Sequence, residues 1–247
     1  MPTTSGTYTF AATLTQIITS ALRKIGVLAE GDTPNPDQQN NALFVLQTVL
    51  DEAEADGMPL WAVVEQLIPC SSFTNGKYTF PSDGTAPLKV LSAYNRNNVV
   101  STQPIDIPMT VLTHNDYNWL SNKLTQGTAV QFYYEPLNQG GNLFIWPIPD
   151  SYSNSYRSIN ITYQRPFQDV GSVVTDNIDF PPYWTNAIIY ALASRLAPEY
   201  GSPPNDRQLL IQEARAYWEH ALEFGTEEGS VYVEPDWSRM YQGRGNT

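Results

Sequence analysis

Few residues of this chain have the types and spacing of a catalytic or metal-binding site. The two histidines, His114 and His220, lie in different segments, and neither belongs to a motif with metal-ligand spacing. We therefore expect no zinc site and no Ser-His-Asp arrangement. Cys70 is the single cysteine, so it cannot form an internal disulfide. We interpret it as a buried small hydrophobic residue, because no reactive-thiol motif surrounds it, and we predict no catalytic residue, metal or cofactor.

The densest group of carboxylates is Asp51, Glu52 and Glu54. A glycosidase uses two carboxyl groups, one of which has a pKa raised by burial. These three residues lie opposite the apolar stripe of the helix predicted around them, so we interpret them as a solvated helix surface. The glycines of "NQGGN" lie between two predicted strands, which favours a hairpin turn over a phosphate-binding loop.

The charge of the chain is strongly acidic. Thirteen basic and 25 acidic residues give a formal net charge of −12, which repels nucleic acid and disfavours a sequence-specific DNA-binding protein. The simplest role of this acidity is solubility, although it also suits a surface past which DNA slides without sticking. The first residues, "MPTTSGTYTF", lack the basic start and apolar stretch of a secretory signal, and the apolar runs are shorter than the roughly 20 residues that cross a bilayer. We therefore expect neither export from the cytoplasm nor a transmembrane segment.

Two amphipathic helices are predicted near the start of the chain. The first is expected at residues 10–25, with Thr9 as its N-cap and Gly26 as the left-handed residue after its last turn. The second is expected at residues 36–56, with Asn35 as its N-cap. The residues that we expect to face inward are Leu14, Ile17, Ile18, Ala21, Leu22 and Ile25 in the first helix, and Ala42, Leu43, Leu46, Val49, Leu50 and Ala53 in the second.

The section from residue 60 to residue 170 predicts strands separated by turns. Asn75 and Gly76 lie between two alternating runs, which indicates a hairpin with a type I′ turn, since both central residues of that turn need positive φ. A short helix is expected with Thr113 or Asn115 as its N-cap. Further strands are expected at residues 88–94, 129–134, 143–146 and 158–163. Prolines lie on both sides of these runs, as expected for a residue that is excluded from central strands.

Two more helices are predicted after the β-rich section. Pro182 fits the first turn of a helix that Pro198 ends near Ala197, and Gly201 then lets the chain reverse. The last helix is expected to follow "SPPND" and to end at Gly225. The predicted buried residues are Trp184, Ala187, Ile188, Ala191, Leu192 and Leu196 in the first of these helices, and Leu210, Ala214, Tyr217, Trp218, Ala221 and Leu222 in the second.

Together these elements predict an α+β fold. We expect a four-helix bundle formed by N- and C-terminal helix pairs, with an inserted β-rich section and an extended C-terminal tail. The predicted divisions are residues 1–59 and 171–225 for the helix pairs, 60–170 for the β-rich domain and 226–247 for the tail. The tail lacks a hydrophobic period, so we expect it to be either disordered or ordered by a partner. Its apolar and aromatic residues favour a partner, namely Val231, Tyr232, Val233, Trp237, Met240 and Tyr241.

Five stretches of the chain carry a family resemblance: "HNDYNWLSNKLTQGTAVQFYYEP", "LFIWPIPD", "INITYQRPFQDV", "DFPPYWTNAIIYALASRLAPEYG" and "EPD" near the end. They resemble the adaptor, or head-to-tail connector, proteins of short-tailed bacteriophages, which include the packaged DNA stabilisation and tail accessory factor group. The likeness extends from the first predicted helix to about residue 236. It is most specific at "WPIPD" and "LAPEYG", neither of which is a catalytic signature.

The resemblance implies a structural protein of the virion without enzymatic activity, located at the head-tail junction and present in the host cytoplasm during assembly. It implies a ring of about twelve copies beneath the portal protein, which helps to retain packaged DNA and provides the docking platform for the tail tube or nozzle protein. Double-stranded DNA would pass through the channel without sequence-specific binding. The C-terminal extension would reach the portal, so the resemblance makes the six tail residues given above the predicted portal-binding residues.

Two functions of other classes remain as alternatives. One is a virion-associated peptidoglycan hydrolase that uses Glu52 or Glu54 in its carboxylate pair. The other is a carbohydrate-binding or receptor-binding module built on the aromatic β-rich section. Against the second alternative, the aromatic residues fall at alternating strand positions, which a two-sided core explains more simply.

Overall fold

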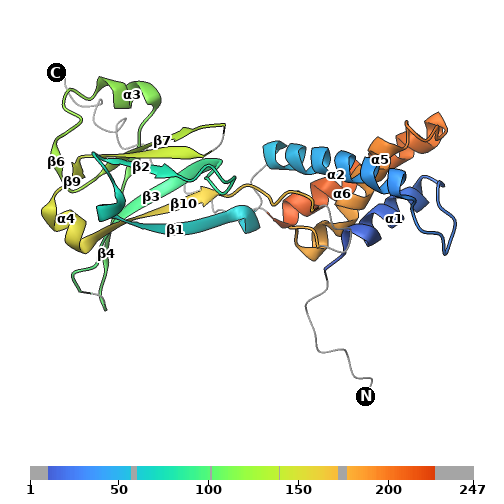
Figure 1. Ribbon diagram of the computed structural model, residues 1–247, viewed down its shortest axis with the longest axis horizontal. Helices are drawn as coiled ribbons and strands as arrows, with labels where there is room; N and C mark the ends of the chain where they lie inside the picture. Colours follow the sequence, from blue (N-terminus) through green and yellow to red (C-terminus); the bar gives the residue numbers. More distant parts are fainter. Residues whose placement is uncertain (1–10, 57–59, 101, 139, 172–176, 226–247) are drawn as a thin grey trace, which may run out of the picture.

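The computed structural model of the chain describes residues 11–56, 60–100, 102–138, 140–171 and 177–225. These residues form an elongated molecule with a helical lobe at one end and a β-rich lobe at the other (Figure 1). None of the described helices is long and apolar enough to span a bilayer. The helical lobe contains α1 (Leu14–Lys24), α2 (Pro36–Asp56), a 3₁₀ turn η3 (Pro182–Trp184), α5 (Thr185–Leu196) and α6 (Pro204–Phe224).

The prediction of a four-helix bundle is wrong, although the α+β class is correct. The described residues form six α-helices and three sheets, with most of the strands in the middle of the chain. In the helical lobe, α1, α2 and α6 each pack chiefly against α5, whereas α1 and α2 barely meet. The physical reason is that α5 buries residues around most of its circumference, which makes it a central helix and not one of four equivalent amphipathic ones. Its buried residues are Ala187, Ile188, Leu192, Ala193 and Leu196.

The helix boundaries at the start of the chain are set by caps. Helix α1 begins at Leu14, four residues later than predicted, because Thr13 forms a capping box with Gln16. The predicted N-cap, Thr9, lies outside the described residues. Gly26 has φ of 76°, and the amide of Val27 donates to the carbonyl of Leu22, so the predicted glycine stop is confirmed.

The start of α2 follows the prediction closely. Its N-cap is Asn35, whose Oδ1 accepts from the amide of Gln38 at 2.8 Å, while Gln38 Oε1 accepts from the amide of Asn35 at 2.9 Å. This reciprocal capping box satisfies two of the amides that the first turn leaves without a helical partner. Of the six residues predicted to face inward on α2, Leu43 is half-buried. The other five are buried, namely Ala42, Leu46, Val49, Leu50 and Ala53.

The two later helices differ from prediction in detail. The turn η3 precedes α5, and Gly201, where the chain was predicted to reverse, has φ of 70°. Helix α6 begins at Pro204, inside the "SPPND" stretch, because proline is well suited to the first helical position. Tyr217 was predicted to be buried but is 42% exposed, and its ring stacks on that of Tyr190 with centroids 5.0 Å apart.

The β-rich lobe is built from two four-stranded sheets that share one core. The first sheet has the antiparallel order β1 (Val63–Pro69), β10 (Arg157–Gln164), β3 (Lys89–Asn97) and β4 (Ile105–Pro108). The second has the order β2 (Lys77–Phe80), β8 (Gly141–Trp146), β7 (Gln131–Pro136) and β5 (Thr110–Val111), with β5 parallel to β7. The remaining elements are the pair β6 (Gln126–Gly127) and β9 (Ile148–Pro149), the helices α3 (His114–Trp119) and α4 (Ser151–Tyr156), and the 3₁₀ turns η1 (Leu60–Ala62) and η2 (Cys70–Ser72).

The strand predictions are confirmed for β3, β7, β8 and β10, whereas β1 and β4 were not predicted. Asn75 and Gly76 form the predicted turn, with φ of 51° and 75°. The turn joins Thr74 to Lys77 by a single bridge, and β2 then pairs with β8 instead of with the preceding residues. Thr113 is the N-cap of α3, one of the two residues predicted for that role.

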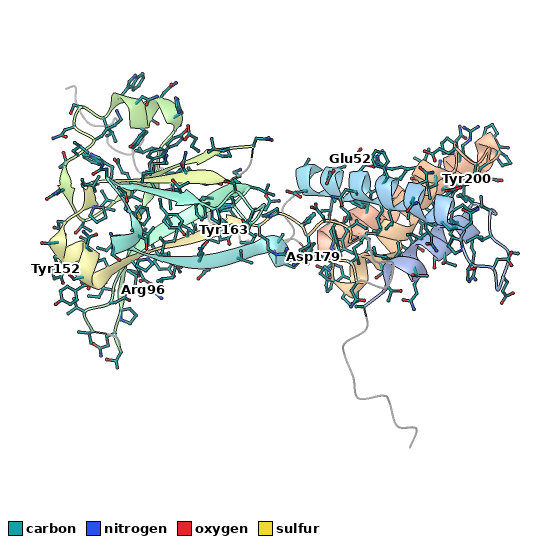
Figure 2. All side chains as sticks on the ribbon, viewed as in Figure 1. Glu52, Arg96, Tyr152, Tyr163, Asp179 and Tyr200 are labelled. Atoms are coloured by element: carbon teal, nitrogen blue, oxygen red, sulfur yellow. The ribbon has the colours of Figure 1, made fainter. Side chains whose placement is uncertain are left out.

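The two lobes meet at an aromatic and ionic junction. The rings of Trp61, Phe167 and Phe180 pack together, with each pair of centroids 4.8–4.9 Å apart. The guanidinium of Arg165 binds both carboxylate oxygens of Asp179 at 2.6 and 3.0 Å, and Asp179 lies between the lobes (Figure 2). These contacts hold the end of β10 against the segment that enters η3. That residues 60–170 form a separate inserted domain stays a prediction.

Candidate functional site

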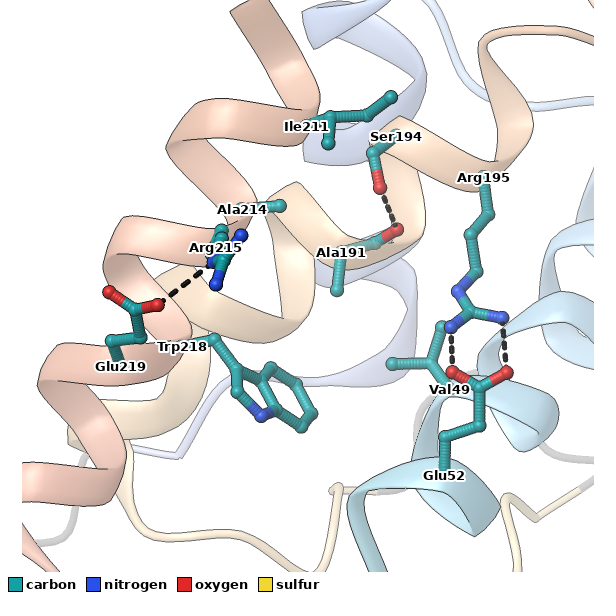
Figure 3. A pocket seen from close by; sticks show the side chains of 10 residues that line it. All are labelled: Val49, Glu52, Ala191, Ser194, Arg195, Ile211, Ala214, Arg215, Trp218 and Glu219. Carbon is teal, nitrogen blue, oxygen red and sulfur yellow. Dashed lines mark hydrogen bonds and ion pairs between the residues drawn. The ribbon is translucent and has the colours of Figure 1, made fainter. Parts of the chain in front are cut away.

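A groove on the helical lobe is the candidate functional site. It lies between α2, α5 and α6 and encloses about 340 Å³ (Figure 3). Small side chains on α5 and α6, at Ala191, Ser194 and Ala214, leave the space open where larger ones would fill it. The other residues that line the groove are Val49, Glu52, Arg195, Ile211, Arg215, Trp218 and Glu219.

The inner surface of the groove is mostly apolar. Val49 and Ala214 are buried at its base, and Trp218 is held in place edge-on to Trp184, with ring centroids 5.1 Å apart. Ile211 is 55% exposed at the opening. An apolar hollow of this size with one exposed aliphatic side chain suits the burial of an apolar side chain from a protein partner.

Two ion pairs border the groove. The guanidinium of Arg195 forms a two-pronged pair with the carboxylate of Glu52, and the Arg195 Nη1 to Glu52 Oε1 distance is 2.8 Å. This hydrogen bond lowers the pKa of Glu52 below its usual value. Along α6, Arg215 Nε lies 2.9 Å from Glu219 Oε1. Both pairs are largely exposed, so each contributes little to stability unless a partner covers it.

Of the candidate hydrolase carboxylates, Glu52 and Glu54 do not face each other as a pair, whereas Asp51 and Glu54 line one cavity. Glu52 lines the groove and is bound by Arg195, whereas Glu54 lines a different cavity at the lobe junction. Partial burial raises the pKa of Glu54, and its Oε2 accepts from the amide of Phe167 at 3.5 Å. A general acid and its partner carboxylate must face one scissile bond, and these two residues face different spaces. The interpretation of Glu54 as a solvated surface residue is also inexact, because it is half-buried.

The other residues considered for chemistry lie apart from the groove or from one another. His114 is on α3, where its Nδ1 lies 2.9 Å from the hydroxyl of Tyr133, and His220 is on α6. Within the described ranges no three His, Cys, Asp or Glu residues gather as metal ligands. Cys70 is fully buried, and this burial raises the pKa of its thiol to about 11. Its burial without a disulfide partner among the described residues confirms its interpretation as a buried small residue.

The aromatic residues of the β-rich lobe pack on both faces of the second sheet. Phe132 is buried in the core between the sheets. On the outer face the rings of Tyr117, Tyr133 and Phe144 stack on one another beneath α3, with centroids 5.0–5.8 Å apart. All three are half-buried, and Tyr117 and Phe144 line an open cavity of about 560 Å³ together with Tyr78, so the packing of these rings does not decide the sugar-binding alternative. Three aromatic residues of this lobe are exposed, namely Trp119 on α3 at 80%, and Tyr152 and Tyr156 on α4 at 46% and 48%.

The six predicted portal-binding residues, from Val231 to Tyr241, lie outside the described residues. Sequence reasoning overlooked Ile211 and Phe44, which are 55% and 71% exposed on α6 and α2. The signal was present in the sequence, because each is an apolar residue off the buried stripe of its helix. The groove itself could not be found in the same way, because one of its walls is α2, which is distant in the chain from α5 and α6.

Comparison with known proteins gives one finding. The family model described as SU10 adaptor protein matches residues 12–237, which includes both lobes and part of the tail. A search of curated proteins finds no match.

Proposed function

The chain belongs to the SU10 adaptor protein family, and from this premise we propose that it forms a ring at the head-tail junction of a phage. Family membership supports a structural role in a phage virion and association with portal and tail components. The observation that carries the proposal is the extent of the family match, which runs from residue 12 to residue 237. As a structural adaptor, the chain is proposed to have no enzymatic activity.

The ring contains about twelve copies of the chain and lies beneath the portal protein, where it helps to retain packaged DNA. The elongated shape, with the two lobes at opposite ends (Figure 1), supports a division of labour between them. The helical lobe would contact neighbouring copies and the portal, and the β-rich lobe would offer the platform for the tail tube or nozzle protein. The net charge of −12 suits a channel through which double-stranded DNA passes without binding to the wall.

The test is light scattering on the full chain with and without its cognate portal protein. We expect a large assembly when the portal is present, with a mass that corresponds to one ring of the chain on one portal. A chain that stays monomeric at a saturating concentration of portal would overturn the proposal. Peptidoglycan zymography on the same preparation should show no clearing, and clearing that a Glu52→Gln or Glu54→Gln variant abolishes would favour the hydrolase instead.

The C-terminal tail is the proposed portal-binding segment. Truncation after Gly225 should abolish binding to the portal, because it removes all six proposed contact residues. A second variant, Trp237→Ser, Met240→Ser, Tyr241→Ser, keeps the length of the tail but removes three of the six proposed contacts, so it should also bind the portal more weakly. Loss of binding in the truncated chain but not in the triple variant would move the contact to the earlier part of the tail, and full binding by the truncated chain would refute the assignment.

A further inference from the structure

The open cavity lined by Tyr117 and Phe144 lies in the β-rich lobe, beside β2, β8 and α3, whereas the groove lies in the helical lobe (Figure 1). The cavity and the groove share no lining residue. The volume of the cavity, about 560 Å³, lies within the range of sites that bind small molecules, about 300–1,000 Å³. The cavity is therefore a candidate binding site that is separate from the groove.

One wall of the cavity is the aromatic ring of Phe144. This residue pairs across the sheet with Tyr133 of β7 on one side and with Lys77 of β2 on the other. The ring of Tyr133 stacks on one face of Phe144, with an angle of 16° between the rings and centroids 5.8 Å apart. The opposite face is turned toward β2, where the ammonium of Lys77 lies 5.7 Å from the ring centroid. Lys77 is exposed and its side chain is flexible, so it can move aside for a ligand and donate hydrogen bonds to it.

The rest of the cavity is lined mostly by uncharged side chains that can form hydrogen bonds. Lys77 is the one charged residue among those that line it. In the part of the chain that the structure describes, the hydroxyl of Thr79 donates to Oδ1 of Asn142 at 3.2 Å, and the other polar lining side chains have no hydrogen-bond partner in the protein. The uncharged residues with a hydroxyl or an amide are Ser72, Thr74, Asn75, Tyr78, Thr79 and Tyr117.

An aromatic face beside several unpaired hydroxyl and amide groups matches the chemistry of a saccharide. A pyranose ring has a face of C–H groups that packs on an aromatic ring, and its hydroxyls both donate and accept hydrogen bonds. An apolar side chain of a protein partner fits less well, because it would remove the polar groups from water without giving them partners. Nucleic acid is disfavoured by the net charge of −12 and by the presence of a single lysine in the cavity.

We propose that this cavity is a saccharide-binding site that takes one pyranose unit of an oligosaccharide or polysaccharide. Phe144 provides the stacking surface. The hydrogen bonds to the sugar come from Thr74, Asn75, Lys77 and Tyr117. The site goes beyond the proposed ring and does not depend on it.

A single open site for one sugar unit binds weakly. The affinity that a ligand of this size reaches per atom corresponds to a Kd on the order of 1 mM. On a ring of the proposed kind, one site in each copy would raise the avidity for a polysaccharide with repeating units.

The test is saturation-transfer difference NMR on the full chain without the portal, a method that detects binding at this affinity. The probes are a panel of oligosaccharides that contain glucose, galactose, mannose, rhamnose or N-acetylglucosamine units. We expect saturation transfer to at least one member of the panel, with a Kd on the order of 1 mM or tighter.

The triple variant Thr74→Val, Asn75→Gly, Tyr117→Phe removes three polar groups from the cavity and leaves its shape almost unchanged. These side chains have no hydrogen-bond partner among the described residues, and glycine suits the turn position of Asn75, where φ is 51°. The variant should therefore keep the wild-type unfolding temperature and raise the Kd at least about tenfold. Phe144→Leu keeps an apolar side chain beside Tyr133 but loses the flat face, so it should raise the Kd about fivefold.

The matched control is Tyr133→Phe, which removes a hydroxyl from the same aromatic stack. The hydroxyl of Tyr133 lies 2.9 Å from Nδ1 of His114, and Tyr133 does not line the cavity. This variant should bind the sugar as the wild type does.

A wild-type chain that shows saturation transfer to no member of the panel would overturn the inference and favour a protein contact for this cavity. Full binding by the triple variant and by Phe144→Leu would show that the sugar binds elsewhere, and would overturn the inference equally. Either result leaves the proposed ring intact, because light scattering with the portal tests the ring separately.

Discussion

The turn at Gly76 allows a sharp test of how the β-rich lobe is held together. Gly76 has φ of 75°, and a Cβ built there would lie 2.5 Å from Ile148 Cγ2 and 2.9 Å from the carbonyl oxygen of Ile145. The amide of Ile145 donates to the carbonyl of Gly76 at 2.8 Å, so the turn cannot move away without losing that bond. A Gly76→Ala substitution therefore combines backbone strain with steric overlap against β8 and β9.

The magnitude follows from a matched glycine. Gly84 has φ of 83° and nothing within 4 Å of the Cβ position, so Gly84→Ala carries the backbone strain alone. That strain is about 1–2 kcal/mol, reduced by the 0.4–1 kcal/mol that alanine gains through a less flexible unfolded chain, which leaves about 1 kcal/mol. Overlap in a packed site adds about 1–3 kcal/mol at Gly76, for a total of about 3 kcal/mol.

The assay is thermal unfolding of the full chain, followed by far-ultraviolet circular dichroism. At about 2–4 °C per kcal/mol for a chain of this size, Gly84→Ala should lower the midpoint by about 2–4 °C and Gly76→Ala by about 6–12 °C. Equal shifts in the two variants would refute the reasoning, because they would show that the turn relaxes away from β8 and β9 at no cost.

Three further predictions concern single side chains. Burial raises the pKa of Glu54, so the ionised carboxylate destabilises the fold once the pH rises above 4.5, the usual pKa of a glutamate. The variant Glu54→Gln should therefore raise the urea midpoint at pH 7 and leave it nearly unchanged at pH 4. A larger gain at pH 4 than at pH 7 would contradict this reasoning. Asp179→Asn leaves the mostly buried guanidinium of Arg165 without its carboxylate partner, so it should lower the free energy of unfolding by about 2 kcal/mol. It should also change the fluorescence of Trp61, whose ring lies against Arg165. Unchanged stability would contradict a structural role for this ion pair. The thiol of Cys70, with a pKa of about 11, should react with a thiol reagent at pH 8 only after the chain is unfolded, and rapid reaction of the folded chain would contradict its burial.

The sequence by itself determined the local elements whose signals are carried by neighbouring residues. The capping box of Asn35, the glycine stop at Gly26 and the turn at Gly76 all depend on residues within a few positions of one another. The buried faces of α1 and α2 follow from the period of the helix, and so they were predicted nearly residue by residue. The start of α1 was not, although its signal is also local, because Thr13 and Gln16 have the spacing of a capping box that the prediction of Thr9 overlooked.

Only the tertiary structure decided how these elements combine. An apolar stripe specifies which side of a helix is buried, but it does not specify the helix against which that side packs. Four such stripes therefore predicted a four-helix bundle, whereas in the structure α1, α2 and α6 pack around a central α5. The strand β1 was missed because its side chains do not alternate cleanly, and its place is set by pairing with β10 almost 100 residues later. The groove exists because small side chains on α5 and α6 meet beside α2. The wall formed by α2 is brought to the consecutive helices α5 and α6 by tertiary packing, and no local pattern of residues specifies that packing.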